Sequence, residues 1–217
     1  MKKNPNSAFT LIELLTVIAI IGILASILIP TVAKVRDTAR QAVCSSNIRQ
    51  ISMGMVMFAM DNDGILPSAG AESAGWIGED DFIYYQQGRD IRDSAIAPYV
   101  GDVIEPELFR CPSDTGWEER GENRFFPYSY SMNVLIVSNP SHNDTVGGRL
   151  DRIQDASLIM MLGEEQNPND ARFWPWAPAD QVTRRHGGRG NVSFCDGHVA
   201  LVTWEFAAQQ ENYDPNY

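Results

Sequence analysis

The sequence predicts an α+β fold in which one long amino-terminal helix packs on an antiparallel β-sheet. Three patterns carry this prediction. An apolar run extends from Phe9 to Ile29, a helical spacing of apolar residues continues to Met60, and short strand-like runs occur near the carboxyl end. Each pattern specifies one part of the fold.

The apolar run is long enough to cross a membrane. Its 21 residues would form a helix of about 31 Å, and a bilayer core is roughly 30 Å thick. Lys2 and Lys3 precede the run, so the positive-inside tendency favours a cytoplasmic amino end and export of the remainder. Pro30 follows the run, and because the helical pattern resumes at once, we expect a bend there.

Two other kinds of targeting segment fit the amino terminus less well. A secretory signal peptide has an apolar core of roughly 7–15 residues followed by a small-residue cleavage site. In this chain the small residue, Ala8, precedes the apolar run. An uncleaved single-pass anchor remains an alternative.

Beyond Pro30 the helix is expected to continue and to pack on a globular head. Residues 31–60 contain no proline and only one glycine, Gly54, and their apolar side chains keep a helical spacing. The turn-forming run from Asp61 to Gly64 should end the helix. A composition of 44% hydrophobic and 21% charged residues places the remainder in the globular class.

Two strand predictions concern the head. Leu158–Leu162, closed by Gly163, is expected to be a buried strand. Asp196-Gly197 between two strand-like runs indicates a two-residue hairpin. In that register Phe194 faces Val199 and Val192 faces Leu201, whereas Ser193, Cys195, His198 and Ala200 occupy the other side.

Glu13 is the only charged residue in the apolar run. An ionised carboxylate there costs about 2.5–3.5 kcal/mol on insertion, so we expect it to have a partner. The segment from Ser7 to Glu13 resembles the class III signal of type IV pilins and type II secretion pseudopilins. The resemblance implies cleavage after Ala8, where the family usually has glycine, N-methylation of Phe9, pairing of Glu13 with a neighbouring subunit's amino terminus, and a kink at Pro30.

A second resemblance lies at the carboxyl end. His186 precedes Asp196-Gly197 by nine intervening residues, a spacing similar to the H-X9-DG signature of many pilin-like proteins of planctomycete-type bacteria. The resemblance extends to the segments 44–50, 110–114 and 128–133. This signature indicates a family without revealing a chemistry.

The resemblance implies a structural subunit rather than an enzyme, with no cofactor. Such a subunit is cut by prepilin peptidase, held in the inner membrane by a single pass with a periplasmic head, and built into a type II secretion or type IV pilus-like fibre. Its partners would be prepilin peptidase, other pilin-like subunits and the inner-membrane assembly platform. The expected regions are a leader (1–8), a transmembrane half-helix (9–30), a helix continuation packed on the head (31–61) and a β-rich head (62–217).

Charge argues against nucleic acid as a partner. The formal net charge is −11, and removal of Lys2 and Lys3 with the leader leaves 15 basic against 28 acidic side chains, or −13. Such a surface repels phosphate backbones and anionic lipid.

The three cysteines lie in the exported part, where disulfides persist. Cys44 with Cys111 is the preferred pair, because it would join the helix to the head and leave Cys195 as a free thiol. The other two pairings, and three reduced thiols, remain open, because spacing does not determine connectivity.

Two other functions also fit parts of the sequence. A membrane-tethered metal-binding hydrolase or binding protein would use His186, Asp196 and His198, although an extended strand would separate His186 from Asp196 by about 16 Å. A tip adhesin would use the Trp174/Trp176 loop, although such a loop also fits packing on the core. No nucleophile motif or phosphate-binding loop supports catalysis.

Overall fold

The computed structural model describes residues 10–70, 77–86, 88–101, 104–122, 126–137 and 146–217. The chain divides into two compact units, residues 1–39 and 40–217.

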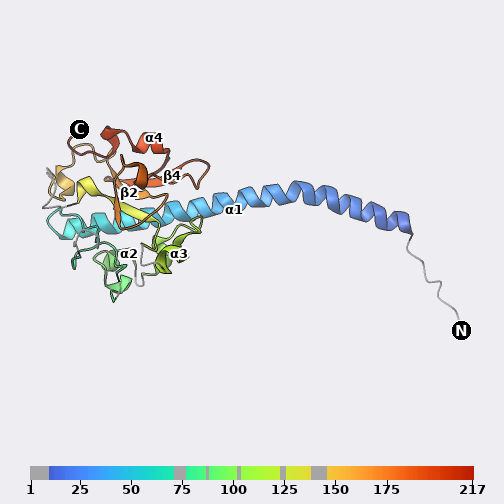
Figure 1. The fold of residues 1–217 in the computed structure, drawn as a ribbon, viewed down its shortest axis with the longest axis horizontal. Helices are drawn as coiled ribbons and strands as arrows, with labels where there is room; N and C mark the ends of the chain where they lie inside the picture. Colours follow the sequence, from blue (N-terminus) through green and yellow to red (C-terminus); the bar gives the residue numbers. More distant parts are fainter. Residues whose placement is uncertain (1–9, 71–76, 87, 102–103, 123–125, 138–145) are drawn as a thin grey trace. The chain divides into compact units, whose positions relative to one another are not determined.

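The long helix expected at the amino end is present. Helix α1 runs from Leu11 to Asp61 and passes through Pro30 without a break (Figure 1). At its end the Gly64 amide donates to the Ala59 carbonyl at 2.8 Å. Gly64 adopts a φ of 81°, which suits glycine because it has no Cβ. The turn predicted after Asp61 therefore ends the helix.

The second half of α1 is the central helix of the unit formed by residues 40–217. Its buried residues recur every three or four positions, as one face of a helix requires: Cys44, Ile48, Ile51, Ser52, Gly54, Met55 and Ala59. Residues 31–40 are exposed. The packing of the whole segment 31–61 on the head stays a prediction.

The head contains a five-stranded sheet in the order β3-β1-β2-β4-β5. Its strands are β1 (Tyr130–Asn133), β2 (Met160–Glu164), β3 (Arg172–Phe173), β4 (Gly190–Phe194) and β5 (Val199–Val202). The α+β architecture is confirmed, but the sheet is mixed rather than purely antiparallel, because β1 and β3 pair in parallel.

Each face of the sheet covers its own core. The larger core joins α1 residues such as Ile48 and Met55 to Tyr130 and Met132 of β1. The smaller core, on the other face, includes Val192 and Phe194 together with Val202, Phe173 and Ala207. Short helices α2 (Ala97–Val100), α3 (Trp117–Glu122) and α4 (Trp204–Ala207) and several 3₁₀ turns complete the head.

The buried strand predicted at Leu158–Leu162 is displaced. Strand β2 begins at Met160 and includes Gly163, whereas Leu158 is 46% exposed. Gly163 does not end this strand. It lies within the strand, where the absence of a Cβ leaves space for a neighbouring ring. A Cβ on Gly163 would lie 2.9–3.1 Å from three ring atoms of the buried Phe173.

The predicted hairpin forms, but its register was wrong by one residue. Ser193 pairs with Val199 and Val192 pairs with Ala200. The rings of Phe194 and His198 stack on each other, with their centroids 4.1 Å apart. The loop therefore has three residues, Cys195 to Gly197, with Gly197 at a φ of 88°. Asp196 does not adopt the positive φ that the two-residue turn needs.

Hydrogen bonds to the rest of the head explain this register. The amides of Cys195 and Asp196 donate to the carbonyls of Ile159 and Ala156 at 2.9 and 3.1 Å. These bonds hold the loop residues outside the β4–β5 ladder. Cys195 and Val199 consequently contact the larger core, and Phe194 contacts the smaller one.

Gly190, the first residue of β4, sits where a side chain has no room. A Cβ there would lie 2.5 Å from Val182 Cγ1 and 2.9 Å from the Thr183 carbonyl oxygen. We predict that Gly190→Ala destabilises the head by about 1–3 kcal/mol, because the backbone carbonyl cannot move aside cheaply. Denaturant unfolding of the full chain in detergent measures this.

Gly22→Ala is the matched control, because nothing lies within 4 Å of a Cβ on Gly22. It should leave the unfolding midpoint of the head unchanged. Equal midpoints for Gly190→Ala and wild type would contradict the close packing at β4.

Candidate assembly segment and buried cluster

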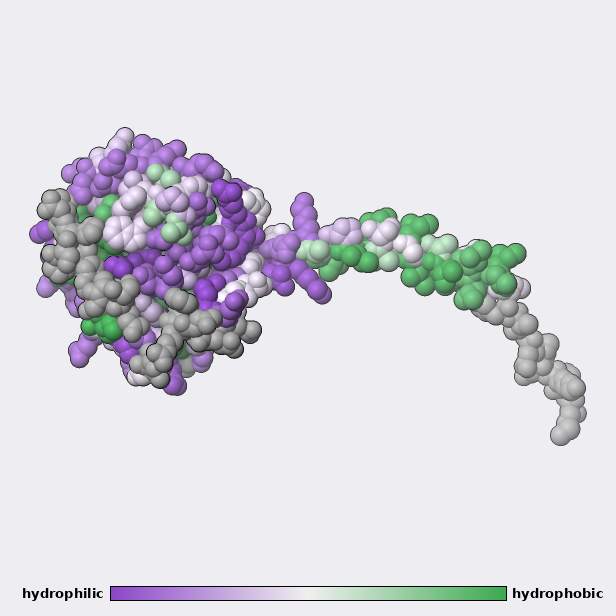
Figure 2. All heavy atoms as spheres, in the orientation of Figure 1, coloured by the Kyte–Doolittle hydropathy of each residue, from purple (hydrophilic) through white to green (hydrophobic). Residues whose placement is uncertain are grey.

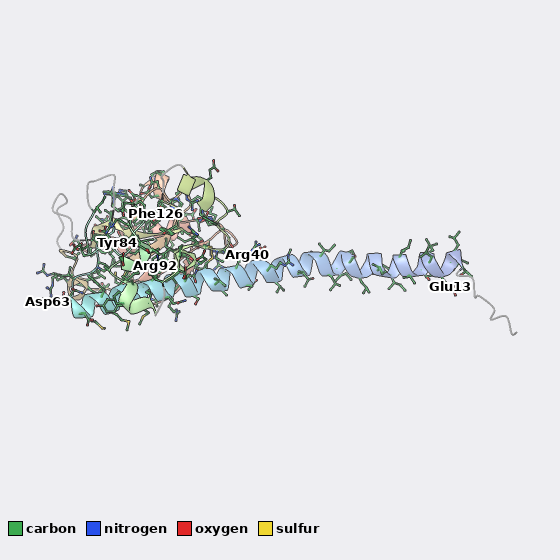
Figure 3. All side chains as sticks on the ribbon, turned by 90° about the horizontal axis from the view of Figure 1, so that it is seen from below. Glu13, Arg40, Asp63, Tyr84, Arg92 and Phe126 are labelled. Carbon is green, nitrogen blue, oxygen red and sulfur yellow. A yellow bond between two sulfur atoms is a disulfide. The ribbon has the colours of Figure 1, made fainter. Side chains whose placement is uncertain are left out.

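Glu13 lies in the first turn of α1 (Figure 3). Its Oε2 accepts hydrogen bonds from the Thr10 amide at 2.8 Å and the Thr10 hydroxyl at 2.7 Å. The Glu13 amide donates to the Thr10 hydroxyl at 3.2 Å. Together these bonds form a capping box, which satisfies donors that the helix start would otherwise leave free.

The surface around Glu13 is apolar. Figure 2 shows hydrophobic residues covering the first half of α1. Their large side chains are 46–81% exposed from Leu11 to Ile29. Within the described residues, α1 is a helix long and apolar enough to cross a membrane. Its exposed surface requires an apolar environment, either lipid or other helices.

Pro30 lies inside this helix and cannot donate the backbone hydrogen bond of a normal residue. Beside it the Thr31 hydroxyl donates to the Ile27 carbonyl at 2.8 Å. The bend at Pro30 stays a prediction. Ala8 and Phe9, the residues expected to flank the cleavage site, lie outside the described residues.

The cysteines adopt the arrangement preferred from the sequence. Cys44 on α1 forms a disulfide with Cys111, and Cys195 is a buried thiol. Burial raises the pKa of the Cys195 thiol strongly, so this thiol is unreactive at neutral pH. The disulfide joins α1 covalently to the segment before β1.

His186 lies against this disulfide rather than near the hairpin tip. Its Nε2 is 3.1 Å from Glu164 Oε1 and 3.4 Å from Cys111 Sγ. We call Cys44, Cys111, Glu164 and His186 the buried cluster. All four are buried, and their ligand atoms lie within 4.8 Å of one another.

The expected grouping of His186 with Asp196 and His198 is not assembled. Asp196 and His198 form a partly exposed pair of their own, with Nδ1 2.6 Å from Oδ1. Among the described residues, the group of three or more potential metal ligands that contains His186 is the buried cluster. The reason is that His186 turns inward to Glu164, whereas Asp196 caps the hairpin loop by accepting from the His198 amide.

A network of charges extends from the buried cluster. Arg185 lies 4.0 Å from Glu164 Oε1 and 3.4 Å from Asp114 Oδ1. Arg120 binds Asp114 at 2.6 Å, and the Ser129 hydroxyl donates to it at 2.8 Å. Burial alone would raise the pKa of Asp114, but these hydrogen bonds and the two guanidinium charges lower it overall.

Glu165, next to Glu164, has a different environment. Its Oε2 lies 2.9 Å from the Ser131 hydroxyl, and its Oε1 has no hydrogen-bond partner among the described residues. Burial raises the pKa of Glu165 well above its usual range, and the nearby carboxylates of Asp180 and Asp170 raise it further. The folded protein therefore favours the protonated form.

We predict that Glu165→Gln stabilises the head at neutral pH. Because the folded pKa is raised, the folded state holds its proton more tightly, and stability falls as pH rises above the ordinary value of 4.5. The glutamine variant should lose this part of the pH dependence. Unfolding midpoints measured from pH 4.5 to about pH 8 test this, and a variant less stable than wild type at neutral pH would contradict it.

The tryptophan loop packs on the end of the chain. The Trp174 and Trp176 rings meet edge to face at 5.2 Å, and Trp176 lies 5.0 Å from the Tyr213 ring. The Trp174 amide donates to Asp180 at 3.1 Å. Trp176 nevertheless remains 38% exposed. These contacts give the loop a structural role.

Three features of these sites were missed from the sequence. The capping box had a readable signal, since threonine followed three residues later by glutamate is its signature. Glu164 had none, because a single acid after an apolar run does not reveal that distant Cys44, Cys111 and His186 meet it. Asp114 likewise depends on Arg120 and Arg185 arriving from separate segments.

Comparison with known proteins locates the similarity at the amino end. Residues 3–29 match the family model of the prokaryotic N-terminal methylation motif. Type II secretion system core protein G of Pseudomonas aeruginosa is 37% identical over 62 residues, which is 29% of this chain and 44% of that protein. Competence protein ComGC of Bacillus subtilis is 37% identical over 73 residues, 33% of this chain and 74% of that protein.

A third relative is the type IV major pilin protein PilA of Myxococcus xanthus, 41% identical over 61 residues, or 28% of each chain. The chain thus spans less than half the length of some of the curated relatives that it matches. No solved structure matches it. The family model does not reach His186 or Asp196-Gly197, so the carboxy-terminal signature stays a prediction.

Proposed function

Because this chain belongs to the family of pilin-like proteins that carry the prokaryotic N-terminal methylation motif, we propose that it is a structural subunit of a type II secretion or type IV pilus-like fibre. Prepilin peptidase cuts it after Ala8, and Phe9 becomes the methylated amino terminus. The observation that carries this proposal is a single carboxylate, Glu13, at the start of an exposed apolar helix.

The apolar half of α1 holds the subunit in the inner membrane before assembly. Lys2 and Lys3 keep the amino end in the cytoplasm, and the head lies in the periplasm. The disulfide between Cys44 and Cys111 is consistent with this location, because disulfides persist in oxidising compartments.

Assembly gives Glu13 a partner outside its own chain. In the single chain its carboxylate is held by two neutral donors of Thr10. Cleavage creates a charged amine at Phe9, one residue before Thr10. An ion pair between this amine and Glu13 of a neighbouring subunit compensates two charges that lipid solvates poorly.

The remaining surface of α1 supports the same assignment. Apolar side chains surround the helix on all sides between Leu11 and Ile29, so several neighbouring helices can pack on it at once. The partners are other pilin-like subunits and the inner-membrane assembly platform. The acidic mature chain, with a formal charge of −13 after loss of the leader, disfavours nucleic acid.

Recovery of the chain from fibres tests this function. Cells that make the full chain and its natural neighbours are sheared, and the fibre fraction is probed for the chain by mass spectrometry. The proposal expects the mature chain in that fraction and its absence from cells that lack active prepilin peptidase. A chain that stays in the membrane fraction of both strains would contradict a fibre role.

A further inference from the structure

The buried cluster presents four potential metal ligands from four separate segments of the unit formed by residues 40–217. Cys44 lies on α1, Cys111 follows a 3₁₀ turn, Glu164 ends β2 and His186 lies in the loop before β4. Their side chains are almost completely inaccessible to solvent. Donor atoms from four segments within 4.8 Å of one another form a site that needs only the sulfur atoms to be reduced.

We propose that the reduced chain binds one Zn²⁺ through the Cys44 and Cys111 sulfurs, the Glu164 carboxylate and the His186 imidazole. A newly made chain carries both cysteines as thiols. Zn²⁺ displaces one proton from each thiol and forms two zinc–sulfur bonds, so two protons are released for each ion bound. No electrons are transferred in this step.

The donor set is suited to zinc. Zn²⁺ prefers four tetrahedral ligands drawn from cysteine sulfur, histidine nitrogen and carboxylate oxygen, and a site with four protein ligands is structural. His186 Nε2 already lies between a sulfur and a carboxylate, 3.4 Å from Cys111 Sγ and 3.1 Å from Glu164 Oε1. Zinc between these atoms would replace a direct hydrogen bond by two coordinate bonds.

Surrounding groups would hold the carboxylate and balance its charge. The Asn191 amide and side chain both donate to Glu164 Oε2, at 3.2 and 2.9 Å. Two thiolates and one carboxylate around Zn²⁺ leave one net negative charge, and the guanidinium of Arg185 lies 4.0 Å from Glu164 Oε1. Hydrogen-bonded ligands and a compensating charge are what a buried metal site requires.

Zinc and the disulfide exclude each other. The disulfide uses both sulfurs and leaves no thiolate for the metal. Zinc would therefore hold α1 to the head in the reduced chain, and the disulfide would do so after oxidation. Conversion of the disulfide form back to the zinc-binding form needs a two-electron reductant. A dithiol can serve, because it is oxidised to its own disulfide while Cys44 and Cys111 are reduced to thiols.

Cobalt binding to the full-length chain in detergent tests the proposal. The chain is reduced with a phosphine under argon, freed of metal and titrated with Co²⁺. We expect one ion per chain with the visible and near-ultraviolet bands of tetrahedral cobalt–thiolate coordination, displaced by Zn²⁺ and absent from the oxidised chain. No such bands in the reduced chain, or equal binding by the oxidised chain, would overturn the proposal.

Variants separate this site from unspecific thiol binding. Glu164→Gln and His186→Ala should each abolish the tetrahedral spectrum, whereas the control Cys195→Ser, which removes the thiol outside the cluster, should retain it. Asn191→Ala should keep one ion per chain but bind it about 10–100-fold more weakly. Full tetrahedral bands in His186→Ala would show that other groups bind the ion and would overturn the assignment.

Cobalt binding by the reduced and the oxidised wild-type chain can be compared without any variant. The proposal is therefore still tested if Glu164→Gln does not fold. Circular dichroism of the reduced chain with and without Zn²⁺ identifies which state is folded. The test is also independent of fibre assembly, because it is made on the purified single chain.

Discussion

Replacing Glu13 by valine is expected to remove the chain from fibres while leaving it in the membrane. The substitution deletes the one charge in the apolar half of α1 and lowers the cost of membrane insertion by about 2.5–3.5 kcal/mol. It also leaves the amine of a neighbouring Phe9 unpaired. Breaking a buried ion pair by removing one partner costs about 3–5 kcal/mol, so we expect about 100-fold or more loss of incorporation.

The controls for this prediction separate charge from helix capping. Thr10→Ala removes the capping box but retains the Glu13 charge, so it should cost only about 1 kcal/mol of helix stability and still permit assembly. Glu13→Gln retains an oxygen that can accept from Thr10 but loses the charge, so it should fail to assemble. Incorporation is measured as the ratio of chain in the sheared-fibre and membrane fractions.

Wild-type incorporation of Glu13→Val would contradict the ion pair as the basis of assembly. Failure of Thr10→Ala together with success of Glu13→Gln would assign the role of Glu13 to capping instead.

Loss of the disulfide is expected to have the largest effect on the stability of the head. The Cys44–Cys111 bond links residues 67 positions apart in the sequence. Closing a loop of this length restricts the unfolded chain and stabilises the fold by about 4 kcal/mol. A chain with both Cys44→Ala and Cys111→Ala should therefore unfold at a much lower denaturant concentration.

Urea unfolding of the full chain in detergent, followed by tryptophan fluorescence, measures this loss. A metal chelator in all samples prevents a bound ion from replacing the disulfide. Cys195→Ala is the control, because Cys195 takes no part in the disulfide, and it should lose only the small packing contribution of one buried sulfur. Equal midpoints for the double variant and wild type would show that the bond does not contribute to stability.

Local patterns predicted the long helix, its end and the position of the hairpin turn, because the causes of these features are local. The 3.6-residue spacing identified α1, and Asp61 to Gly64 identified its end, because glycine alone takes the backbone conformation required there without strain. The hairpin tip was found for the same reason. Its register was not, because hydrogen bonds from Cys195 and Asp196 to the distant residues Ile159 and Ala156 decide it.

The methylation motif at the amino end was predictable because its residues adjoin one another in the sequence. Glu13 in an apolar run is visible without any structure. The buried cluster was not predictable as a unit, since Cys44, Cys111, Glu164 and His186 are brought together only when α1, β2 and the loop before β4 pack. The predicted Cys44–Cys111 pair contains two residues of the buried cluster. The carboxy-terminal spacing drew attention to His186 but did not indicate which residues it contacts.

The identity of the mature amino terminus tests the central claim most directly. The membrane-extracted chain is analysed by intact mass and by mass spectrometry of its terminal peptide, from cells with active prepilin peptidase. A chain that begins at an N-methylated Phe9 is the predicted result, because it places the new amine next to Thr10 and Glu13. A chain that still begins at Met1 in those cells would contradict processing and, with it, assembly through Glu13.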